Sequence, residues 1–192
     1  MNDLAAKRII KPVEEKSLAS SLDFVEQVFA EWDSPEEGKT VRALVQEIRA
    51  KKYYLPELEL LMVDDSGLIL GYAMFSRFHI EGRFDDELLL LSPVAVRGEF
   101  RRQHISKDMI EHGFGRAVKM GFKAVLVEGD PKNYAARGFV PSHKFAITAG
   151  PEINLPHPDC LMIKELIPGA AGKMRGTVEY SFYETLSIIE KK

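Results

Sequence analysis

One stretch, Pro93 to Phe139, constrains the fold more than any other part of this 192-residue chain. An apolar run leads into a basic turn, an amphipathic segment, a second apolar run and then the sequence from Asp130 to Tyr134. A strand, a helix and a second strand of this length normally form a right-handed parallel crossover. We therefore expect a loop at the start of one helix and a tyrosine near the end of the following strand, within one compact unit.

The first strand of this unit is interrupted by a proline. Leu88 to Val96 is continuously apolar instead of alternating, which is typical of a strand covered on both faces. Pro93 cannot donate a hydrogen bond to a neighbouring strand, so it indicates a bulge or a place where two strands part. Parted strands would leave backbone groups free to bind an extended ligand. An edge strand with a proline kink is the alternative.

The basic turn from Arg97 to Ser106 precedes a helix that Gly121 is well placed to end. Free N–H groups and the positive end of the helix dipole favour a phosphate at such a position, and Arg101 and Arg102 can add charge-assisted contacts. A solvated turn is the alternative. The chain has neither a P-loop motif nor a G-x-G-x-x-G motif between strand and helix. The helix would bury Ile105, Met109, Ile110, Phe114 and Ala117.

The N-terminal half predicts two helices and a hairpin. Lys7 to Lys11 suggests a short edge strand, and apolar residues recur at helical spacing from Leu18 to Trp32. Ser34 can cap a second helix that begins with a proline. Leu58 to Val63 and Leu68 to Phe75, joined by turn-forming residues, predict an antiparallel hairpin. The second helix would bury Val41, Leu44, Val45 and Ile48.

Composition excludes several classes of protein. The 26 basic and 29 acidic residues give a formal charge of -3, too balanced for a general nucleic-acid or acidic-membrane binder. The single cysteine, Cys160, excludes an internal disulfide and fits a reducing compartment. The first residues lack the apolar core of a signal peptide, and no apolar run reaches the roughly 18 residues of a membrane span. We expect one main core in a soluble, cytoplasmic protein.

These residues resemble the GNAT superfamily of acyl-CoA-dependent N-acetyltransferases. Val94 to Val96 is similar to the strand that lies along the pantetheine arm, and Arg101 to Ser106 takes the place of the family's Q/R-x-x-G-x-G/A pyrophosphate loop. Asn133 to Phe139 is similar to the family's Y-x-x-x-G-F segment. The resemblance covers most of the chain, including later strands near Lys144–Ile147 and Cys160–Leu166.

The resemblance implies an α/β (α+β) fold with a mixed, mostly antiparallel sheet, a splayed parallel strand pair and helices on both faces. It places the acetyltransferase domain at residues 1–167. Residues 168–192 resemble the C-terminal extension of a bacterial branch of the family. Because this extension is too apolar to stay solvated, it should pack on the domain or on the second subunit of a homodimer. Its apolar residues include Tyr180, Phe182, Tyr183, Leu186, Ile188 and Ile189.

The resemblance also implies acetyl-CoA as the acyl donor. The cofactor-binding residues carried over from the family are Val94, Ala95, Val96, Arg101, Arg102, Gln103, His104, Ile105, Ser106 and Asn133. His104 and Ser106 replace the two glycines of the family's loop. Ser106 is small and its hydroxyl could donate to a phosphate. His104 preserves binding only if its backbone adopts the turn, and histidine is among the less penalised residues at positive φ.

Tyr134 is the expected catalytic residue, by resemblance and by chemistry. A phenol with a pKa of about 10 is protonated at neutral pH and can give its proton to the departing CoA thiolate. Packing against the cofactor slot is the alternative role. Glu87 and Glu128 are candidate bases for the attacking amine, or exposed carboxylates at strand ends. His79, His112, His143 and His157 show no metal-ligand spacing, so no metal is expected.

The acceptor is a primary amine of unknown identity: a small metabolite, a peptide N-terminus and a lysine side chain all remain open. Substrate choice in such a fold would come from the first two helices and their loop, Trp32 to Thr40, and from loops near Arg77 to Asp86. The substituted glycines motivate a second hypothesis, a non-catalytic CoA-binding sensor or interaction module. A scaffold that binds only protein through its tail is a third.

Overall fold

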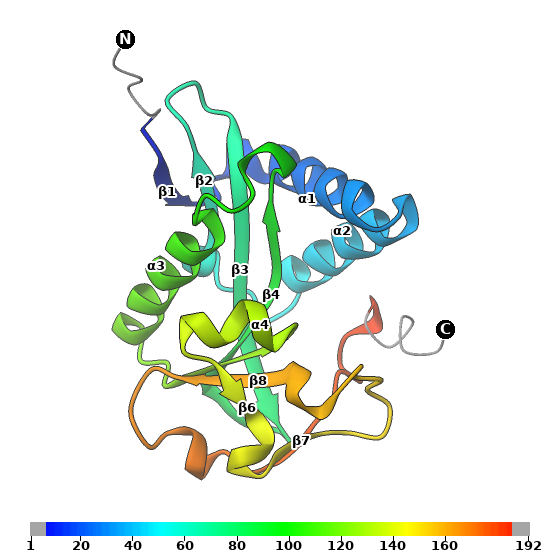
Figure 1. Cartoon of the computed structure of the whole chain (residues 1–192), viewed down its shortest axis with the longest axis vertical. Helices are drawn as coiled ribbons and strands as arrows, with labels where there is room; N and C mark the ends of the chain where they lie inside the picture. The colour runs from blue at the N-terminus through cyan, green and yellow to red at the C-terminus, as the bar shows by residue number, and fades with distance from the viewer. Residues whose placement is uncertain (1–6, 186–192) are drawn as a thin grey trace.

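A seven-stranded sheet organises the protein in this computed structural model, which describes residues 7–185 (Figure 1). Its order is β1-β2-β3-β4-β5-β8-β6, and within this sheet, as described over residues 7–185, only β4 and β5 are parallel neighbours. The mixed, mostly antiparallel sheet expected from the sequence is therefore confirmed. The strands are β1 (Ile9–Pro12), β2 (Glu59–Val63), β3 (Ile69–Ile80), β4 (Arg83–Val96), β5 (Ala124–Glu128), β6 (Val140–Pro141) and β8 (Leu161–Glu165).

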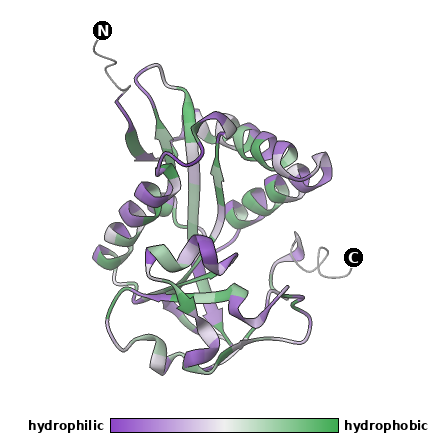
Figure 2. Ribbon diagram, viewed as in Figure 1, coloured by the Kyte–Doolittle hydropathy of each residue, from purple (hydrophilic) through white to green (hydrophobic). Residues whose placement is uncertain are grey.

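Helices cover both faces of the sheet, also as expected. α1 (Leu18–Trp32) and α2 (Pro35–Ala50) pack on one face, and α3 (Ile105–Lys119) packs on the other (Figure 1). Hydrophobic and hydrophilic residues alternate along these helices, as amphipathic helices require (Figure 2). Side chains of β5 point alternately into the two cores: Leu126 joins the α1–α2 side and Val125 joins the α3 side.

Local signals account for the start of α2. The Ser34 hydroxyl accepts a hydrogen bond from the Glu37 N–H at 3.1 Å, and Pro35 occupies the first helical position. The predicted inner face is buried at Val41, Leu44, Val45 and Ile48. The predicted edge strand is confirmed as β1, which begins two residues later and ends one residue later than expected. Within residues 7–185, no helix is long and apolar enough to cross a membrane.

β4 and β5 pair only over three residues each and then part. Leu88–Leu90 pairs with Ala124–Leu126, after which β5 continues beside β8 and β4 continues to Val96 along β3. The β3–β4 register shifts at Ser92 and Pro93, which are joined by a cis peptide bond and lie opposite Met74. The bulge and the parting of strands expected from Pro93 are both present. The parted strands open a slot beside Val94–Val96.

The N-terminus of α3 lies tightly against β3 because Gly71 has no side chain. A Cβ at Gly71 would lie 2.6 Å from Ile105 Cγ2 and 2.8 Å from Met109 Sδ, distances that neither side chain could accept without moving. The first turn of α3 is thereby fixed over the end of β4, since Gly71 itself pairs with Val96. The sheet thus holds the basic turn at the mouth of the slot.

The region after β6 differs from its predicted structure. Lys144 and Phe145 lie in a 3₁₀ helix, Ser142–Phe145, so the strand expected from Lys144 begins only with β7 (Ile147–Ala149). Ala146, with φ of 56°, turns the chain between them, and the Ser142 hydroxyl donates to the Ile147 carbonyl at 2.8 Å. β7 pairs in parallel with β9 (Gly176–Val178) in a separate two-stranded sheet. The other short helices are α4 (Pro131–Tyr134) and 3₁₀ turns at Glu15–Ser17, Pro56–Leu58, Gly98–Phe100, Ala135–Arg137, Pro158–Cys160 and Ala171–Lys173.

The described part of the C-terminal extension packs on the domain. Its residues Ala171, Met174, Val178 and Tyr183 are buried in the core that also contains α1 and α2. The Glu47 carboxylate on α2 accepts hydrogen bonds from the N–H groups of Glu184 and Thr185 at 2.7 and 2.8 Å. Leu186, Ile188 and Ile189 lie outside the described residues. The division at residue 167 and any packing on a second subunit stay predictions.

Candidate active site

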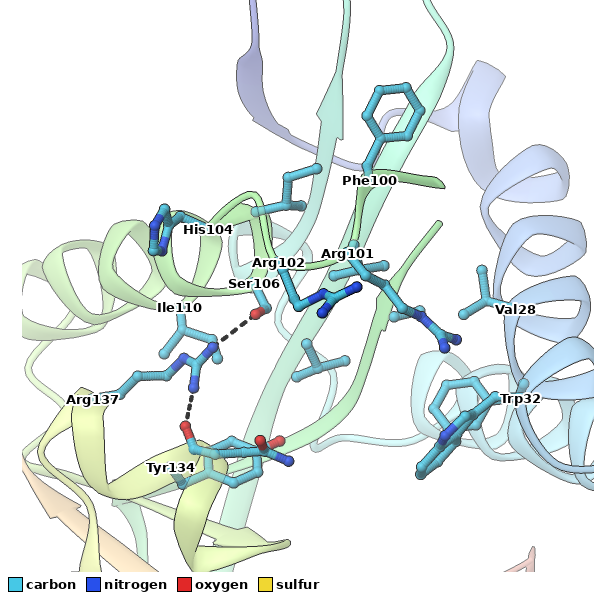
Figure 3. A pocket seen from close by; sticks show the side chains of 16 residues that line it. Val28, Trp32, Phe100, Arg101, Arg102, His104, Ser106, Ile110, Tyr134 and Arg137 are labelled. Atoms are coloured by element: carbon cyan, nitrogen blue, oxygen red, sulfur yellow. Dashed lines mark hydrogen bonds between the residues drawn. The ribbon is translucent and has the colours of Figure 1, made fainter. Parts of the chain in front are cut away.

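A cavity of about 610 Å³ lies where β4 and β5 part, between α1, the turn before α3, and the α4 segment (Figure 3). One wall is the end of β4 together with the turn and the first residues of α3. The opposite walls come from α1 and from the segment that carries Tyr134. The lining residues are Val28, Phe29, Trp32, Val94, Ala95, Val96, Phe100, Arg101, Arg102, His104, Ile105, Ser106, Ile110, Asn133, Tyr134 and Arg137.

Tyr134 and the predicted cofactor-binding residues converge on this cavity, with one exception. Gln103 is outside the lining because its backbone carbonyl and its side-chain oxygen both accept hydrogen bonds from the Arg8 guanidinium. Sequence reasoning missed Val28, Phe29, Phe100, Ile110 and Arg137 as lining residues. The first helix, with Trp32 at its end, was expected only as part of the region that governs substrate choice.

His104 has the left-handed backbone conformation for which glycine is usual. Its φ and ψ are 63° and 8°, and it immediately precedes the first residue of α3. A non-glycine residue pays about 1–2 kcal/mol for this conformation. The imidazole lies on the side of the turn away from Arg101 (Figure 3). The turn is therefore formed despite the missing glycine, and it does not place the histidine ring among the arginines.

The N-terminal end of α3 at His104–Ser106, which we call the mouth of α3, has the features of an anion site. The first N–H groups of a helix have no partner inside the helix, and no side chain caps this one. Arg101 and Arg102 project from the preceding turn into the cavity, and Arg137 approaches from the opposite side (Figure 3). Together with the positive end of the helix dipole, these groups favour a phosphate or diphosphate.

Tyr134 is held by tight packing at the end of α4. The helix begins where the Asp130 carboxylate accepts a hydrogen bond from the Lys132 N–H at 2.9 Å. The Tyr134 ring lies on the backbone of Gly129, where a Cβ would be only 2.4 Å from a ring carbon. Phe139 meets it edge-on at 5.5 Å between centroids. Burial raises the pKa of Tyr134, and the Arg137 charge opposes this only in part, so the phenol is protonated at neutral pH.

Arg137 ties the tyrosine segment to the mouth of α3. Its Nη2 donates to the Ser106 hydroxyl at 2.8 Å, and its Nη1 donates to the Asn133 carbonyl (Figure 3). Its Nε is buried without a hydrogen-bond partner among the described residues. The guanidinium also lies 5.9 Å from the centre of the Tyr134 ring. An arginine just before Gly138-Phe139 is the only sequence signal that could have pointed to this residue.

The two candidate bases lie in different places. Glu87 belongs to the first half of β4, away from Val94–Val96, and forms an ion pair with Lys123 at 3.0 Å. Glu128 ends β5, just beyond the point where the strands part, and its Oε2 accepts from the Tyr180 hydroxyl at 3.4 Å. The residue is exposed overall, yet nearby protein atoms desolvate its carboxyl and raise its pKa, while the Tyr180 hydrogen bond acts in the opposite direction. Neither glutamate lines the cavity.

Within the described residues, no group of three or more histidine, cysteine, aspartate or glutamate side chains could hold a metal ion. The fold is an α/β domain in which one parallel pair of strands parts beside the N-terminus of a helix. Three arginines line the cavity at that point, and this arrangement suits an extended, anionic ligand. Residues 23–145 match the model of the acetyltransferase (GNAT) family. Because this match covers more than half of the chain, the protein belongs to that family.

Individual relatives agree with this assignment. The uncharacterised N-acetyltransferase YhbS of Escherichia coli K12 is 32% identical over 82 residues, which are 43% of this chain and 48% of that protein. The match thus spans about half the length of this curated relative. A crystal structure of E. coli YhbS in complex with CoA has a TM-score of 0.81 at 22% identity, over 95% of this chain and 94% of the other. A Brucella melitensis GNAT acetyltransferase in complex with acetyl-CoA has a TM-score of 0.59 at 26% identity, over 70% and 83% of the two chains.

Proposed function

We propose that this protein transfers an acetyl group from acetyl-CoA to a primary amine by direct attack, with Tyr134 as the general acid. The observation that carries the proposal is the position of Tyr134 across one cavity from the free helix mouth at His104–Ser106. The CoA and acetyl-CoA complexes of the similar structures support the identity of the donor. Family membership supports the reaction type.

In this proposal, the CoA diphosphate binds the N–H groups at the start of α3. Arg101, Arg102 and Arg137 add charge-assisted contacts, and the Ser106 hydroxyl adds a donor. The pantetheine arm lies along Val94–Val96, whose outer edge faces the gap left by β5. This arm would replace the missing strand partner and direct the thioester toward Tyr134. Asn133 would contact the cofactor from the opposite wall.

The chemistry requires three proton movements: the ammonium loses one proton before attack, the nitrogen loses a second once it has bonded to the carbonyl carbon, and the departing sulfur gains one. The amine nitrogen attacks the thioester carbonyl carbon, the carbon–sulfur bond breaks, and the CoA thiolate takes the Tyr134 proton. The second nitrogen proton returns Tyr134 to its phenol form. The raised pKa of Tyr134 keeps that proton available throughout the neutral range. The amine must lose a proton before it attacks. Glu128 is better placed than Glu87 to accept that proton through water, because it lies where the strands part.

The test measures CoA thiol release from acetyl-CoA with and without a panel of primary amines, alongside calorimetric titration of CoA. Binding together with amine-dependent release supports the transferase. Binding without release by any amine would favour a CoA-binding sensor or interaction module, and absence of binding would favour a protein-binding scaffold. The left-handed turn at His104 argues against a degenerate loop, because the conformation usually supplied by glycine is retained. A cytoplasmic location, a homodimer and the absence of a nucleic-acid partner stay predictions.

A further inference from the structure

The α1 wall of the cavity is apolar and aromatic. Val28, Phe29 and Trp32 contribute to the lining, and the Phe29 and Trp32 rings meet edge-on with centroids 5.9 Å apart. Trp32 is 66% exposed, well above the 43% of Val118 and of Ile167. Folding of α1 does not require a tryptophan at this position, because its helix face is already anchored by the buried Val25 and Val28. Two adjoining aromatic rings on one wall of a cavity, unlike a singly exposed apolar residue, are typical of a ligand contact.

This wall lies opposite the groups assigned to CoA. The arginines, the helix mouth and Val94–Val96 belong to the turn, to α3 and to β4, whereas Phe29 and Trp32 belong to α1. Figure 3 shows Trp32 and Tyr134 on different sides of the same space, with Arg101 directed between the turn and α1. Once CoA occupies its own wall, the α1 wall faces the second reactant.

The charges of the lining restrict that reactant further. Within the described residues, the cavity lining contains no aspartate or glutamate. An acceptor with a second ammonium group would therefore bring a positive charge into the cavity without a carboxylate to pair with it, which is costly. An acceptor with one amine and an apolar remainder brings no second charge, and its single ammonium group becomes neutral when it is deprotonated for attack. Flat rings are favoured because an aromatic pair contributes about 0.5–1.5 kcal/mol beyond the area it buries.

We propose that Phe29 and Trp32 bind the apolar, ring-bearing part of the acceptor, so that the preferred substrates are primary amines with one positive charge and an aromatic group. This inference rests on the proposed acetyltransferase function and names its substrate class. Polyamines and small polar amines are the disfavoured classes.

Trp32 supplies its own optical probe because it is the only tryptophan in the chain. Phenethylamine, ethanolamine and spermidine are titrated into the CoA-saturated protein while tryptophan emission is recorded. We expect a saturable change in emission with phenethylamine. Its midpoint concentration should be at least tenfold below that of ethanolamine or spermidine. Equal responses to the three amines, or no response to phenethylamine, would overturn the inference.

Kinetics of Trp32→Ala and Trp32→Phe then show whether the α1 wall contacts the acceptor amine or CoA. For Trp32→Ala we expect the KM for phenethylamine to rise about tenfold, which corresponds to about 1.4 kcal/mol, while the Kd for CoA stays unchanged. Trp32→Phe should recover most of the loss. Val118→Ala is the matched control, since Val118 is 43% exposed on α3 and does not line the cavity. Weaker CoA binding by Trp32→Ala, with amine preference intact, would assign this wall to the cofactor and overturn the inference.

Failure of this inference is distinguishable from failure of the proposed function. If phenethylamine and ethanolamine release CoA thiol with equal kcat/KM, the protein is a transferase and only the aromatic acceptor is wrong. If CoA binds but no amine in the panel releases thiol, the transferase function fails, and the acceptor inference fails with it.

Discussion

The guanidinium of Arg137 donates to the hydroxyl of Ser106 at 2.8 Å and so joins the segment that carries Tyr134 to the mouth of α3. These two residues are 31 positions apart and lie on different elements. The same arginine donates to the Asn133 carbonyl. The proposed anion site and the proposed proton donor are therefore connected through a single side chain.

Arg137→Ala should weaken CoA binding about tenfold. The change removes a cation from the cavity and breaks the connection to Ser106, and a hydrogen bond to a charged group contributes about 1.5–3 kcal/mol. Arg137→Lys should give an intermediate Kd, because lysine keeps the charge but not the two-pronged geometry. Calorimetric titration of CoA measures the effect. An unchanged Kd for Arg137→Ala would show that the guanidinium has no part in holding the cofactor.

Tyr134→Phe should lower kcat by about 10²–10⁴-fold, the usual contribution of a positioned acid, and leave the Kd for CoA unchanged. Because burial raises the pKa of Tyr134 above its ordinary value of 10.0, loss of its proton should not limit the wild-type rate until the pH exceeds 10. A pH–rate profile of both proteins checks this. Turnover unaffected by the substitution would remove Tyr134 from the mechanism.

His104→Gly should raise the Tm and keep or tighten CoA binding, because glycine adopts the left-handed conformation without the cost of about 1–2 kcal/mol that histidine bears. His104→Val should weaken CoA binding, since a β-branched residue strongly resists this conformation. Thermal unfolding and CoA titration of the pair give the comparison. If both variants behave as wild type, the geometry of this turn does not govern the site.

Much of the fold follows from the sequence because its signals are local. Pro93 marks the bulge where β4 leaves β5, and Ser34 with Pro35 starts α2. The helical spacing from Leu18 to Trp32 gives α1 with its bounds. Each of these features is fixed by the conformational preferences of residues close together in the chain.

The missed features depend on contacts between distant segments. Trp32 continues the helical apolar pattern of α1, but its side chain is 66% exposed and lines the cavity, and the pattern alone could not tell a core residue from a cavity residue. The link from Arg137 to Ser106 depends on how the 3₁₀ turn Ala135–Arg137 is placed against α3, which no motif encodes. Lys144 looked like part of a strand, whereas Ala146 reverses the chain before β7 begins.

Glu59→Ala should destabilise the protein by about 3–5 kcal/mol, because it leaves the Arg49 charge partly buried without its partner. Glu59 is fully buried and accepts hydrogen bonds from Arg49, from Tyr54 at 2.6 Å and from Tyr72 at 2.7 Å. Urea unfolding measures the loss. Glu152→Ala, at an exposed site, should change the stability by less than about 0.5 kcal/mol. An equally small effect of Glu59→Ala would show that the buried Glu59 carboxylate does not stabilise the fold through Arg49.

Glu47 should make stability depend on pH between about 4.5 and 2. Desolvation opposes its ionisation, but hydrogen bonds from Lys51, Thr185 and Glu184 outweigh that effect and lower its pKa from 4.5 to about 2. A lowered folded-state pKa stabilises the fold above the unfolded pKa, and that contribution is lost as the pH falls through the folded value. Glu47→Gln should therefore be less stable than wild type at pH 7, with the difference shrinking below pH 4.5. Urea midpoints at pH 7, 4.5 and 3 test this, and a constant difference would refute it.

A crystal structure with bound CoA tests the central claim most directly. We predict that the diphosphate contacts the backbone N–H groups of His104–Ser106, that the pantetheine arm lies beside Val94–Val96, and that the thiol ends within reach of the Tyr134 hydroxyl. A diphosphate bound elsewhere, or a thiol remote from Tyr134 with the β4–β5 gap still empty, would contradict the proposed mechanism.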